Sequence, residues 1–411
     1  MEKNKKKILI VLTKPPYPPT DGTRKKLWED VIKGLAAEFD LDLLLIGPEK
    51  LSPETASALG SIFNRIISFS ISKPFFICRA IRSLISGKPL QTEAYGYKAA
   101  SSWLKTNIDN YQAAYFHTIR TGKYLEQLTV PQINKVLLDL NDAISLNYQD
   151  AQRLAPFPWR LIYRWEKNRV ARYELKLLSL VKYVNVVSNF DEQYLQANCR
   201  QRNQVCPDFL HISSSIEKAP SEHHLVSDRP RLLFFGNLNY PPNRDALIYF
   251  LRNIWPSIKK TIPLIELSVA GQGGRKLRKK NNEKEINFLG FVPDLDALFS
   301  QINFTVAPLR FGAGVPTKIL ESLVRGVPVL TTLLGSRGLA APELGEEKRG
   351  LVCLDEKNPE EWVMTIRSLL SDGTRRQKLS DAASNFSAIN YDRNVIQEKY
   401  RAAMRLICEG H

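Results

Sequence analysis

The sequence of 411 residues has few cysteines, few histidines and no long apolar run. Its five cysteines are odd in number and scattered, so they lack the close pairs typical of zinc sites and small disulfide scaffolds. A reducing cytoplasm is the simplest setting for such a chain. No apolar stretch is long enough to span a bilayer, and residues 1–7 lead into a strand pattern instead of a secretory apolar segment. We therefore expect a cytoplasmic protein, soluble or bound peripherally to a membrane.

Several catalytic signatures are also missing from the chain. We find no Walker-type phosphate loop, no serine nucleophile elbow and no paired-carboxylate hydrolase signature. Asp139 and Asp142 do not have the Asp-x-Asp spacing of a metal motif, and a turn or helix cap is the leading interpretation of this pair. We expect an enzyme without a metal and without a cofactor.

Acidic residues are outnumbered, and the formal net charge is +16. Such a charge favours an anionic partner, for which nucleic acid, a phosphorylated substrate and an acidic membrane surface all qualify. The most basic run, residues 275–280, carries little aromatic interleaving, and no nucleic-acid-binding module is recognisable. We therefore expect no nucleic-acid partner.

Residues 72–88 combine apolar and basic side chains at roughly helical spacing. An ordinary amphipathic helix packed on its own sheet is the favoured interpretation, because most such stripes belong to the core. A helix lying on an anionic membrane surface is the alternative. The apolar members are Phe75, Phe76, Ile77, Ile81, Leu84 and Ile85, and the basic ones are Lys73, Arg79, Arg82 and Lys88.

Strand-like runs alternate with helical stretches throughout, which predicts an α/β fold with parallel sheets wound by helices. Residues 212–230, rich in Ser, Glu and His, have the composition of a linker between two such series. A long helix is expected near 159–180 and a last one near 393–408. Strands are expected at 7–12, 41–46, 65–70, 113–117, 136–139 and 184–187, and then from 232 and at 264–270, 286–289, 304–307, 327–332 and 351–354.

Residues 310–332 are the most informative part of the chain, and they begin with a glycine-rich loop. Gly312 and Gly314 let the backbone approach a ligand, and Pro316 suits the first turn of a helix. Free N–H groups at the start of a helix favour phosphate or sugar hydroxyls. The loop therefore predicts an anion site.

The helix after this loop carries two charged candidates. Lys318 and Glu321 are three residues apart and so project from one helical face. Gly326 is placed to end the helix, and residues 327–332 have the pattern of a parallel strand buried on both sides.

The stretch 310–332 resembles the donor-site segment of family 4 glycosyltransferases, retaining enzymes that use sugar nucleotides. Residues 235–243 look like the first strand and loop of the donor domain in the bacterial exopolysaccharide branch, 269–273 like the next strand end, and 289–294 like the loop near the nucleotide base. The resemblance covers nearly the whole chain and is more specific in the second half. It implies a GT-B fold, with two facing Rossmann-like domains and a deep interdomain cleft.

The resemblance also implies a division of the chain and of its roles. Residues 1–215 would form the acceptor-side domain, 216–390 the nucleotide-sugar-binding domain, and 391–411 a helix that crosses back to the first domain. The donor-binding residues carried over are Gly22, Gly236, Asn237, Arg244, Gly271, Phe291, Val292, Arg310, Gly312, Ala313, Gly314, Val315, Lys318 and Glu321.

Two positions depart from the family pattern. Many members have two glutamates with seven residues between them, but Ala313 takes the place of the first, so Glu321 stands alone with the implied contact to the nucleotide ribose. Its alternative role is a carboxylate near a helix start, stabilised by the dipole and by Lys318. Members also often place an arginine where this chain has Asn237.

Positive charge is still needed on a departing diphosphate. Lys318, Arg310 and Arg244 are the available cations, and Lys318 is the strongest because it lies close to the helix N-terminus. For Arg310 and Arg244 a solvated surface cation is an equally good interpretation.

Two candidates lie in the first half of the chain. Gly22 ends a Pro-rich loop after the first strand, and the resemblance makes this the loop that approaches the donor phosphates and the acceptor; a rigid turn is the alternative. His117 ends an apolar strand, and the matching family histidine contacts the reacting sugar, whereas a lone histidine is usually structural. The catalytic candidates are His117, Lys318 and Glu321.

The resemblance implies a retaining transferase that moves a sugar from a nucleotide-diphosphate donor to a hydroxyl acceptor, a glycan or lipid-linked acceptor of the cell surface. A peripheral position on the inner face of the plasma membrane, with an anionic lipid surface as partner, follows from that acceptor and from the net charge. A sugar-nucleotide epimerase of the same fold and a non-catalytic glycan-binding relic are the alternatives.

Overall fold

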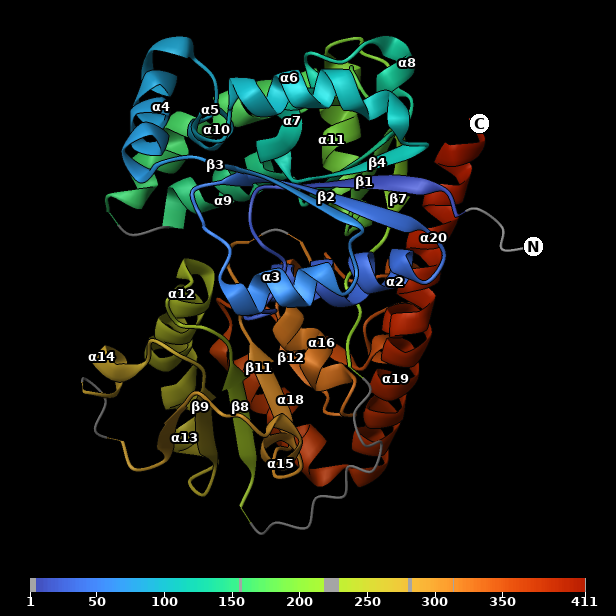
Figure 1. Ribbon diagram of the computed structural model, residues 1–411. Coiled ribbons are helices and arrows are strands. Elements are labelled where there is room, and N and C mark those ends of the chain that lie inside the picture. The colour runs from blue at the N-terminus through green and yellow to red at the C-terminus, as the bar shows by residue number, and fades with distance from the viewer. Residues whose placement is uncertain (1–4, 155–156, 218–228, 280–282, 313, 411) are drawn as a thin grey trace. The chain divides into compact units, whose positions relative to one another are not determined.

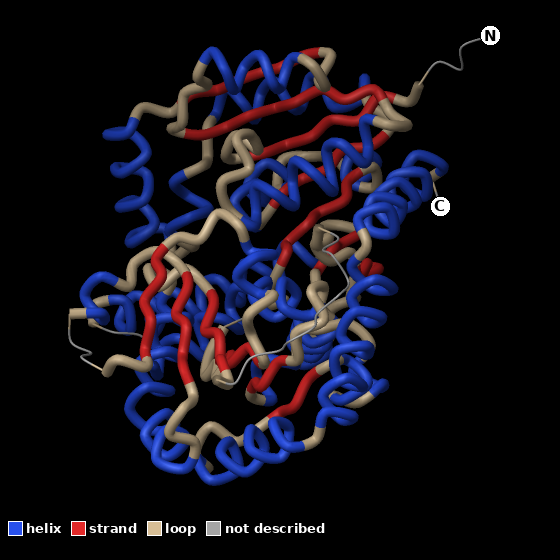
Figure 2. Tube along the Cα trace, turned by 90° about the horizontal axis from the view of Figure 1, so that it is seen from below, coloured by secondary structure: helices blue, strands red, loops and turns tan. Residues whose placement is uncertain are grey.

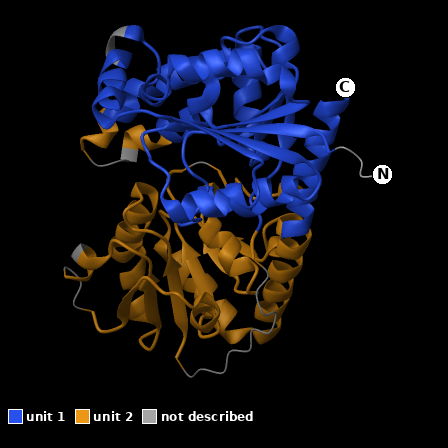
Figure 3. Ribbon diagram, in the orientation of Figure 1, with its two compact units in different colours: residues 1–149, 162–215, 393–411 blue, residues 150–161, 216–392 orange. Residues whose placement is uncertain are grey.

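The computed structural model describes residues 5–154, 157–217, 229–279, 283–312 and 314–410. The chain divides into two compact units (Figure 3). Unit 1 comprises residues 1–149, 162–215 and 393–411, and unit 2 comprises 150–161 and 216–392. Each unit contains one parallel sheet flanked by helices (Figures 1 and 2), so the predicted α/β fold class is confirmed.

Unit 1 has a seven-stranded parallel sheet in the order β3-β2-β1-β4-β5-β6-β7. The interior strand β1 is apolar after Lys7 and is buried on both faces: Leu9 and Val11 face one core cluster, and Ile8 and Ile10 face the other. The strands are β1 Lys7–Leu12, β2 Asp40–Gly47, β3 Arg65–Ser70, β4 Ala113–His117, β5 Val136–Asn141, β6 Tyr183–Val186 and β7 Asp208–His211.

The helices of unit 1 cover both faces of this sheet, and α9 and α10 run across the division between the units. They are α1 Gly22–Lys25, the π-helix Lys26–Ile32, α2 Lys33–Ala36, α3 Pro53–Gly60, α4 Lys73–Ser86, α5 Leu90–Ala94, α6 Lys98–Asn107, α7 Gly122–Leu125, α8 Val130–Ile133, α9 Ile144–Leu154, α10 Trp159–Leu178, α11 Asn189–Gln201 and α20 Arg393–Glu409, with 3-10 turns at Ile108–Asn110 and Ile119–Thr121.

Unit 2 has a six-stranded parallel sheet in the order β10-β9-β8-β11-β12-β13. Leu232 and Phe234 of β8 face the larger core cluster, whereas Leu233 faces a smaller one with Phe299. The strands are β8 Arg231–Phe235, β9 Glu266–Ala270, β10 Ile286–Gly290, β11 Phe304–Ala307, β12 Val329–Thr331 and β13 Leu351–Cys353.

The helices of unit 2 alternate with these strands. They are α12 Pro241–Tyr249, the π-helix Phe250–Ile254, α13 Trp255–Thr261, α14 Arg275–Arg278, α15 Leu295–Phe299, α16 Thr317–Leu323, α17 Leu333–Ser336, α18 Pro359–Ser371 and α19 Gly373–Tyr391, with 3-10 turns at Pro342–Leu344 and Glu347–Arg349. None of the helices in the described ranges is both long and apolar enough to cross a membrane.

The favoured interpretation of residues 72–88 as a helix packed on its own sheet is only partly right. The residues form α4, and Phe76 packs against the core of unit 1. Phe75, Ile77 and Ile81 are instead exposed to solvent. The helix therefore has an apolar side that the described chain leaves uncovered.

Candidate active site

Each sheet has a point at which the strand order reverses. In unit 2 the chain builds β8, β9 and β10 in one direction and then returns to add β11 on the other side of β8. Connections therefore leave the carboxyl ends of β8 and β11 in opposite directions, and open α/β sheets bind ligands at such a switch point. Most of the donor-site candidates lie at or beside this edge.

Glycines allow two connections at this edge to approach each other closely. Gly236 follows β8 with φ +147°, and Gly271 follows β9 with φ +135°. A Cβ atom on Gly271 would lie 1.9 Å from the carbonyl oxygen of Gly236, so a side chain at this position is excluded. Both predicted glycine positions are thus required by the backbone itself.

Lys318 lies at the start of α16 and is almost fully buried. Its Nζ donates a hydrogen bond to Oδ1 of Asn243 and lies 5.5 Å from the centre of the Phe234 ring. Asn243 in turn donates from Nδ2 to the carbonyl oxygen of Asn237, at 3.0 Å. Burial lowers the pKa of Lys318 from 10.5 to about 7. The switch point therefore holds a cation whose charge a neighbouring anion would stabilise.

The glycine-rich loop lies between β11 and α16. Gly312 and Gly314 have φ values of +141° and +71°, which favour glycine, and Val315 is half-buried. Pro316 caps α16 and stands just outside it, since the helix begins at Thr317, which corrects the expected place of this proline in the first turn. The candidate position Ala313 lies outside the described residues.

Glu321 is half-buried on α16, one turn after Lys318. Its Oε2 lies 2.6 Å from Nη1 of Arg325, and Nε of the same arginine lies 2.7 Å from Oδ1 of Asp296. The sequence reasoning missed Arg325 as its partner. Glu321 thus shares one arginine with a second carboxylate from outside the glycine-rich segment.

The other two cations differ in how far they are neutralised. Arg310 forms a two-pronged pair with Asp245, at 2.9 Å from Nε and 2.6 Å from Nη2, and its guanidinium lies over the Tyr249 ring. Arg244 is exposed at the start of α12. Since the charge of Arg310 is already balanced, Lys318 has the stronger claim on a diphosphate.

Phe291 and Val292 follow β10 at the outer part of the same edge. Phe291 is largely exposed, and Val292 packs partly against Phe299 and its neighbours. An exposed aromatic ring on this loop is available for stacking. At the inner part of the edge, Oδ1 of Asn237 accepts a hydrogen bond from the backbone of Asn239, at 2.9 Å, and so shapes the turn after β8.

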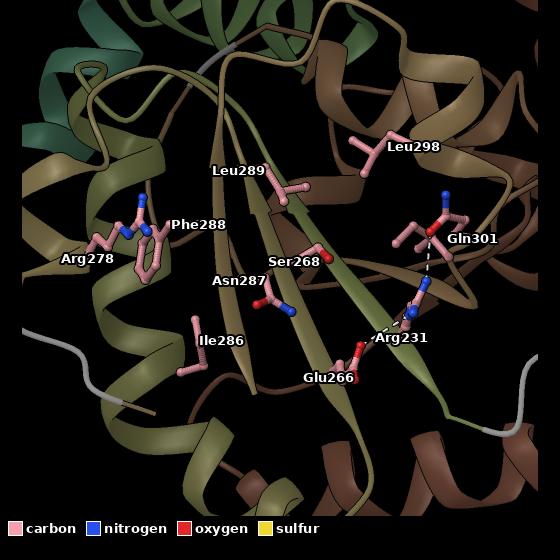
Figure 4. A pocket seen from close by; sticks show the side chains of 11 residues that line it. Arg231, Glu266, Ser268, Arg278, Ile286, Asn287, Phe288, Leu289, Leu298 and Gln301 are labelled. Carbon is pink, nitrogen blue, oxygen red and sulfur yellow. Dashed lines mark hydrogen bonds and ion pairs between the residues drawn. The ribbon is translucent and has the colours of Figure 1, made fainter. Parts of the chain in front are cut away.

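A separate pocket of about 370 Å³ lies on one face of β8, β9 and β10 (Figure 4). Three of its polar side chains bind one another, because Arg231 binds Glu266 at 3.2 Å and Gln301 at 2.7 Å. These residues come from the amino ends of β8 and β9 and from the turn after α15. The pocket therefore does not contain the predicted donor residues.

The corresponding switch point of unit 1 lies between β1 and β4. His117 ends β4 and is buried, with Nδ1 3.3 Å from the hydroxyl of Tyr115 and no hydrogen-bond partner for Nε2 in the described chain. Burial lowers the pKa of His117 to about 4, against the opposing charge of Asp139, so the ring is neutral at neutral pH. Thr118, the next residue, has φ +65°, an uncommon conformation for a threonine.

A buried charge network supports His117. Asp139 of β5 binds Nζ of Lys26 at 3.1 Å and accepts a hydrogen bond from the Tyr115 hydroxyl at 2.6 Å. Tyr400 of α20 donates to the same carboxylate at 3.3 Å. Burial, the largest single effect, raises the pKa of Asp139, but the lowering effects together outweigh it. They are led by the charge of Lys26 and include hydrogen bonds from Tyr115 and Lys26, so the net pKa lies below the ordinary value. Asp139 is therefore an ionised member of a network.

This network fixes the proton of His117. The Tyr115 hydroxyl uses its one O–H to donate a hydrogen bond to Asp139, so its oxygen accepts a hydrogen bond from Nδ1–H of His117. Nε2 then carries the lone pair and is the free acceptor of the ring. Lys26, Tyr115 and Tyr400 were missed in the sequence because they come from separate segments with no shared motif.

Gly22 lies where the Pro-rich loop after β1 meets the first helix, as the sequence predicts. It begins α1 and is exposed, and Asp21 before it caps the helix by accepting a hydrogen bond from the backbone of Arg24, at 2.9 Å. Gly22 therefore has no need of a left-handed conformation. Across the described residues no group of three His, Cys, Asp or Glu side chains is placed to hold a metal ion.

Comparisons with known proteins agree with this geometry. Residues 229–372 match the model of the family Glycosyl transferases group 1. The "Uncharacterized 44.6 kDa protein in cps region" of Klebsiella pneumoniae is 21% identical over 345 residues, which are 81% of this chain and 84% of that protein.

Two solved structures have the same fold over almost their whole length. Anabaena Alr3699/HepE in complex with UDP aligns over 97% of this chain and all of that chain, with a TM-score of 0.64 and 14% identity. WaaG, a glycosyltransferase involved in lipopolysaccharide biosynthesis, aligns over 97% and 99%, with a TM-score of 0.60 and 15% identity. The two-sheet architecture is that of the GT-B fold. The chain therefore has the GT-B fold, and its residues 229–372 are similar to the glycosyl transferases group 1 family.

Proposed function

We propose that the protein transfers a sugar from a nucleotide-diphosphate donor to a hydroxyl acceptor, with retention of configuration, in the synthesis of a cell-surface or exopolysaccharide glycan. The observation that carries this proposal is the buried Lys318 at the switch point of unit 2, beside the glycine turn of Gly236 and the loop of Gly312 and Gly314. The match of this same segment to the group 1 model supports it. The UDP of HepE and the cps region of the Klebsiella relative support the donor class and the glycan.

In this proposal the donor diphosphate binds at the switch point of unit 2. Lys318 and backbone N–H groups of the glycine-rich loop stabilise its phosphates, and Glu321 accepts hydrogen bonds from the ribose hydroxyls. The sugar–phosphate bond breaks as the acceptor oxygen bonds to the same sugar carbon, and the acceptor proton goes to the departing phosphate. Positioning and charge stabilisation then supply most of the catalysis.

His117 keeps the role that the family resemblance implies, a contact to the reacting sugar. Its neutral ring and free Nε2 suit it to accept a hydrogen bond from a sugar hydroxyl, which a protonated histidine is unable to do. The interdomain cleft in which donor and acceptor would meet stays a prediction. A glycan or lipid-linked acceptor and a place on the inner membrane face are likewise part of the proposal.

A donor screen tests the proposal. UDP-, GDP- and ADP-sugars are compared by thermal shift, because a ligand that binds the folded state raises its melting temperature. Nucleotide and sugar products are then followed with and without glycan acceptors. Stabilisation by one donor together with transfer of its sugar is expected. Interconversion of the bound sugar without transfer would assign an epimerase, and binding of glycans without any nucleotide would contradict the proposal.

A further inference from the structure

Helix α4 presents apolar side chains to solvent among basic ones. It carries three basic residues and no acidic residue over its 14 positions. Several exposed apolar side chains on one helix are typical of an interaction site, and nothing in the described chain covers these. The exposed apolar residues are Phe75 (47%), Ile77 (57%) and Ile81 (56%), and the basic residues are Lys73, Arg79 and Arg82.

The start of α10 has the same character. Its first two turns are exposed on nearly every side, although they contain two tryptophans and two aliphatic residues. The only acidic residue in these turns and the next, Glu166, is buried and accepts a hydrogen bond from the backbone of Leu90 at 2.8 Å. In the part of α10 that belongs to unit 1, the exposed apolar residues are Ile162 (36%) and Trp165 (38%), and the basic ones are Arg164 and Lys167.

The two helices lie against each other. Arg169 of α10 donates a hydrogen bond to the carbonyl oxygen of Ser83 in α4, at 3.0 Å, and both helices appear at the same end of the unit 1 sheet (Figure 1). Arg169 lies 3.4 Å from the centre of the Trp165 ring, and Arg79 lies 4.5 Å from that of Phe75. Cations are thus held on aromatic faces within this pair of helices.

We propose that α4 and residues 162–168 of α10, which belong to the same unit, form one surface that docks on an anionic lipid bilayer. Apolar and aromatic side chains would enter the interface between headgroups and acyl chains, and arginines and lysines would bind lipid phosphates. Charge complementarity selects this occupant. A second copy of the chain would bring two basic surfaces together, and a soluble polyanion would leave the apolar side chains uncovered.

This inference rests on the proposed function in one respect only: access to a lipid-linked acceptor is the reason for docking. The docking itself requires no nucleotide and no sugar, so the two are tested separately. The affinity for UDP, measured by calorimetry, is expected to be equal in the wild type and in every surface variant below.

The first arm tests charge by co-sedimentation with vesicles of phosphatidylcholine alone and of phosphatidylcholine with an equal part of phosphatidylglycerol. Binding to the anionic vesicles is expected, with loss at high salt. Arg79→Gln with Arg82→Gln is expected to weaken it tenfold or more, because each basic residue near such a surface contributes about fivefold. The matched control is Arg275→Gln with Arg278→Gln, the same charge change on the exposed α14 of unit 2, which is expected to bind as the wild type.

The second arm tests insertion of the apolar side chains. Ile77→Ser with Ile81→Ser is expected to abolish sedimentation, whereas Ile389→Ser with Met364→Ser, at somewhat more exposed positions of unit 2, leaves it unchanged. Brominated lipid is expected to quench tryptophan emission in the wild type, and less in Trp165→Phe, which keeps an apolar ring.

Three results would overturn the proposal. The first is equal binding to neutral and anionic vesicles, and the second is an equal loss of vesicle binding in the unit 2 control variants. The third is self-association of the protein in the absence of lipid that Ile77→Ser with Ile81→Ser abolishes. The last result would assign the surface to a second copy of the chain.

Discussion

Lys318 is an unusual lysine, since its charge is buried and its hydrogen-bond partner in the described chain is not a carboxylate. Its polar partner is the neutral amide of Asn243, and burial alone lowers its pKa to about 7. A buried cation of this kind destabilises the fold, because the unfolded chain keeps the proton more easily. The benefit is therefore to be sought in ligand binding, where a diphosphate would supply the missing negative charge.

We predict that Lys318→Met weakens UDP binding but raises the stability of the folded protein. The affinity for UDP is expected to fall about ten- to hundredfold, since a charge-assisted hydrogen bond contributes about 1.5–3 kcal/mol. The folded protein releases the Lys318 proton near pH 7 and the unfolded chain only near 10.5, so the unfolded state binds more protons between these values. Wild-type stability should thus gain from rising pH in this window, a gain that the variant lacks.

Calorimetry with UDP and urea unfolding at about pH 6.5 and 8.5 check this prediction. UDP binding by the wild type is also expected to weaken as the pH rises, because Lys318 loses its proton. Lys260→Met, at an exposed lysine of α13, is the control and should change neither quantity. Unchanged UDP affinity in Lys318→Met would place the diphosphate elsewhere, with Arg244 as the next candidate.

The ion pairs of Arg325 offer a matched test of Glu321. Glu321→Gln and Asp296→Asn each remove one carboxylate from the same arginine. Their effects on stability should be similar and below about 1 kcal/mol, as for other partly exposed pairs. We predict that only Glu321→Gln lowers donor turnover and UDP affinity, tenfold or more, because Asp296 lies outside the glycine-rich segment. Equal effects of the two variants would return Glu321 to a structural role.

Much of the site could be named from the sequence, but its pairings could not. Gly236, Gly271, Lys318 and Glu321 stand in local motifs, so their positions at one edge follow once the strands are placed. The contact of Lys318 with Asn243 joins residues 75 apart, and that of Lys26 with Asp139 joins residues 113 apart. Such contacts depend on the packing of whole elements, which periodicity does not encode.

At the scale of elements, two turns at the carboxyl edge of the unit 2 sheet lie so close together that glycine is required between them. The turn after β9 passes so close to the turn after β8 that only hydrogen fits on the Cα of Gly271. Gly290, at the end of β10, also has a positive φ of +72°, but nothing lies within 4 Å of a Cβ added there. Substitutions at the two glycines therefore distinguish the cost of crowding, at Gly271, from the cost of a positive φ alone, at Gly290.

We predict that Gly271→Ala destabilises the protein by more than about 3 kcal/mol and weakens UDP binding, because the methyl group forces the two turns apart. Gly290→Ala should cost only about 1–2 kcal/mol, the strain of a left-handed alanine. Urea unfolding and UDP calorimetry on both variants decide the matter. Similar losses in the two variants would mean that the close approach at Gly271 has no role.

The elements themselves were largely predictable because buried parallel strands are continuous apolar runs. β1, β3, β4 and β11 begin and end where the sequence predicts them. β7, Asp208–His211, was missed because it is a short edge strand with no fully buried residue. The exposure of α4 and of the first turns of α10 was equally hidden, since a helical stripe looks the same whether or not something covers it.

At the scale of the molecule, the chain returns to unit 1 after completing unit 2. Helix α20 contributes Ile396, Tyr400, Met404 and Ile407 to a core cluster of unit 1, together with Ile8 and Ile10 of β1. Tyr400 also binds Asp139 in the network that supports His117. Unit 1 therefore has an incomplete core until the last helix is present, although most of it is translated first.

We predict that Ile396→Ala with Met404→Ala selectively destabilises unit 1. Each truncation of a buried side chain costs about 2–5 kcal/mol, so the pair removes much of the stability of a typical domain. Hydrogen exchange should show early loss of protection in β1 and β4, whereas β8 and β11 stay protected and the affinity for UDP is kept. The converse variant, Ile366→Ala with Leu369→Ala in the core of unit 2, should expose β8 and β11 first and weaken UDP binding. If both pairs instead open the two sheets together, the units unfold as one body and α20 does not act through unit 1 alone.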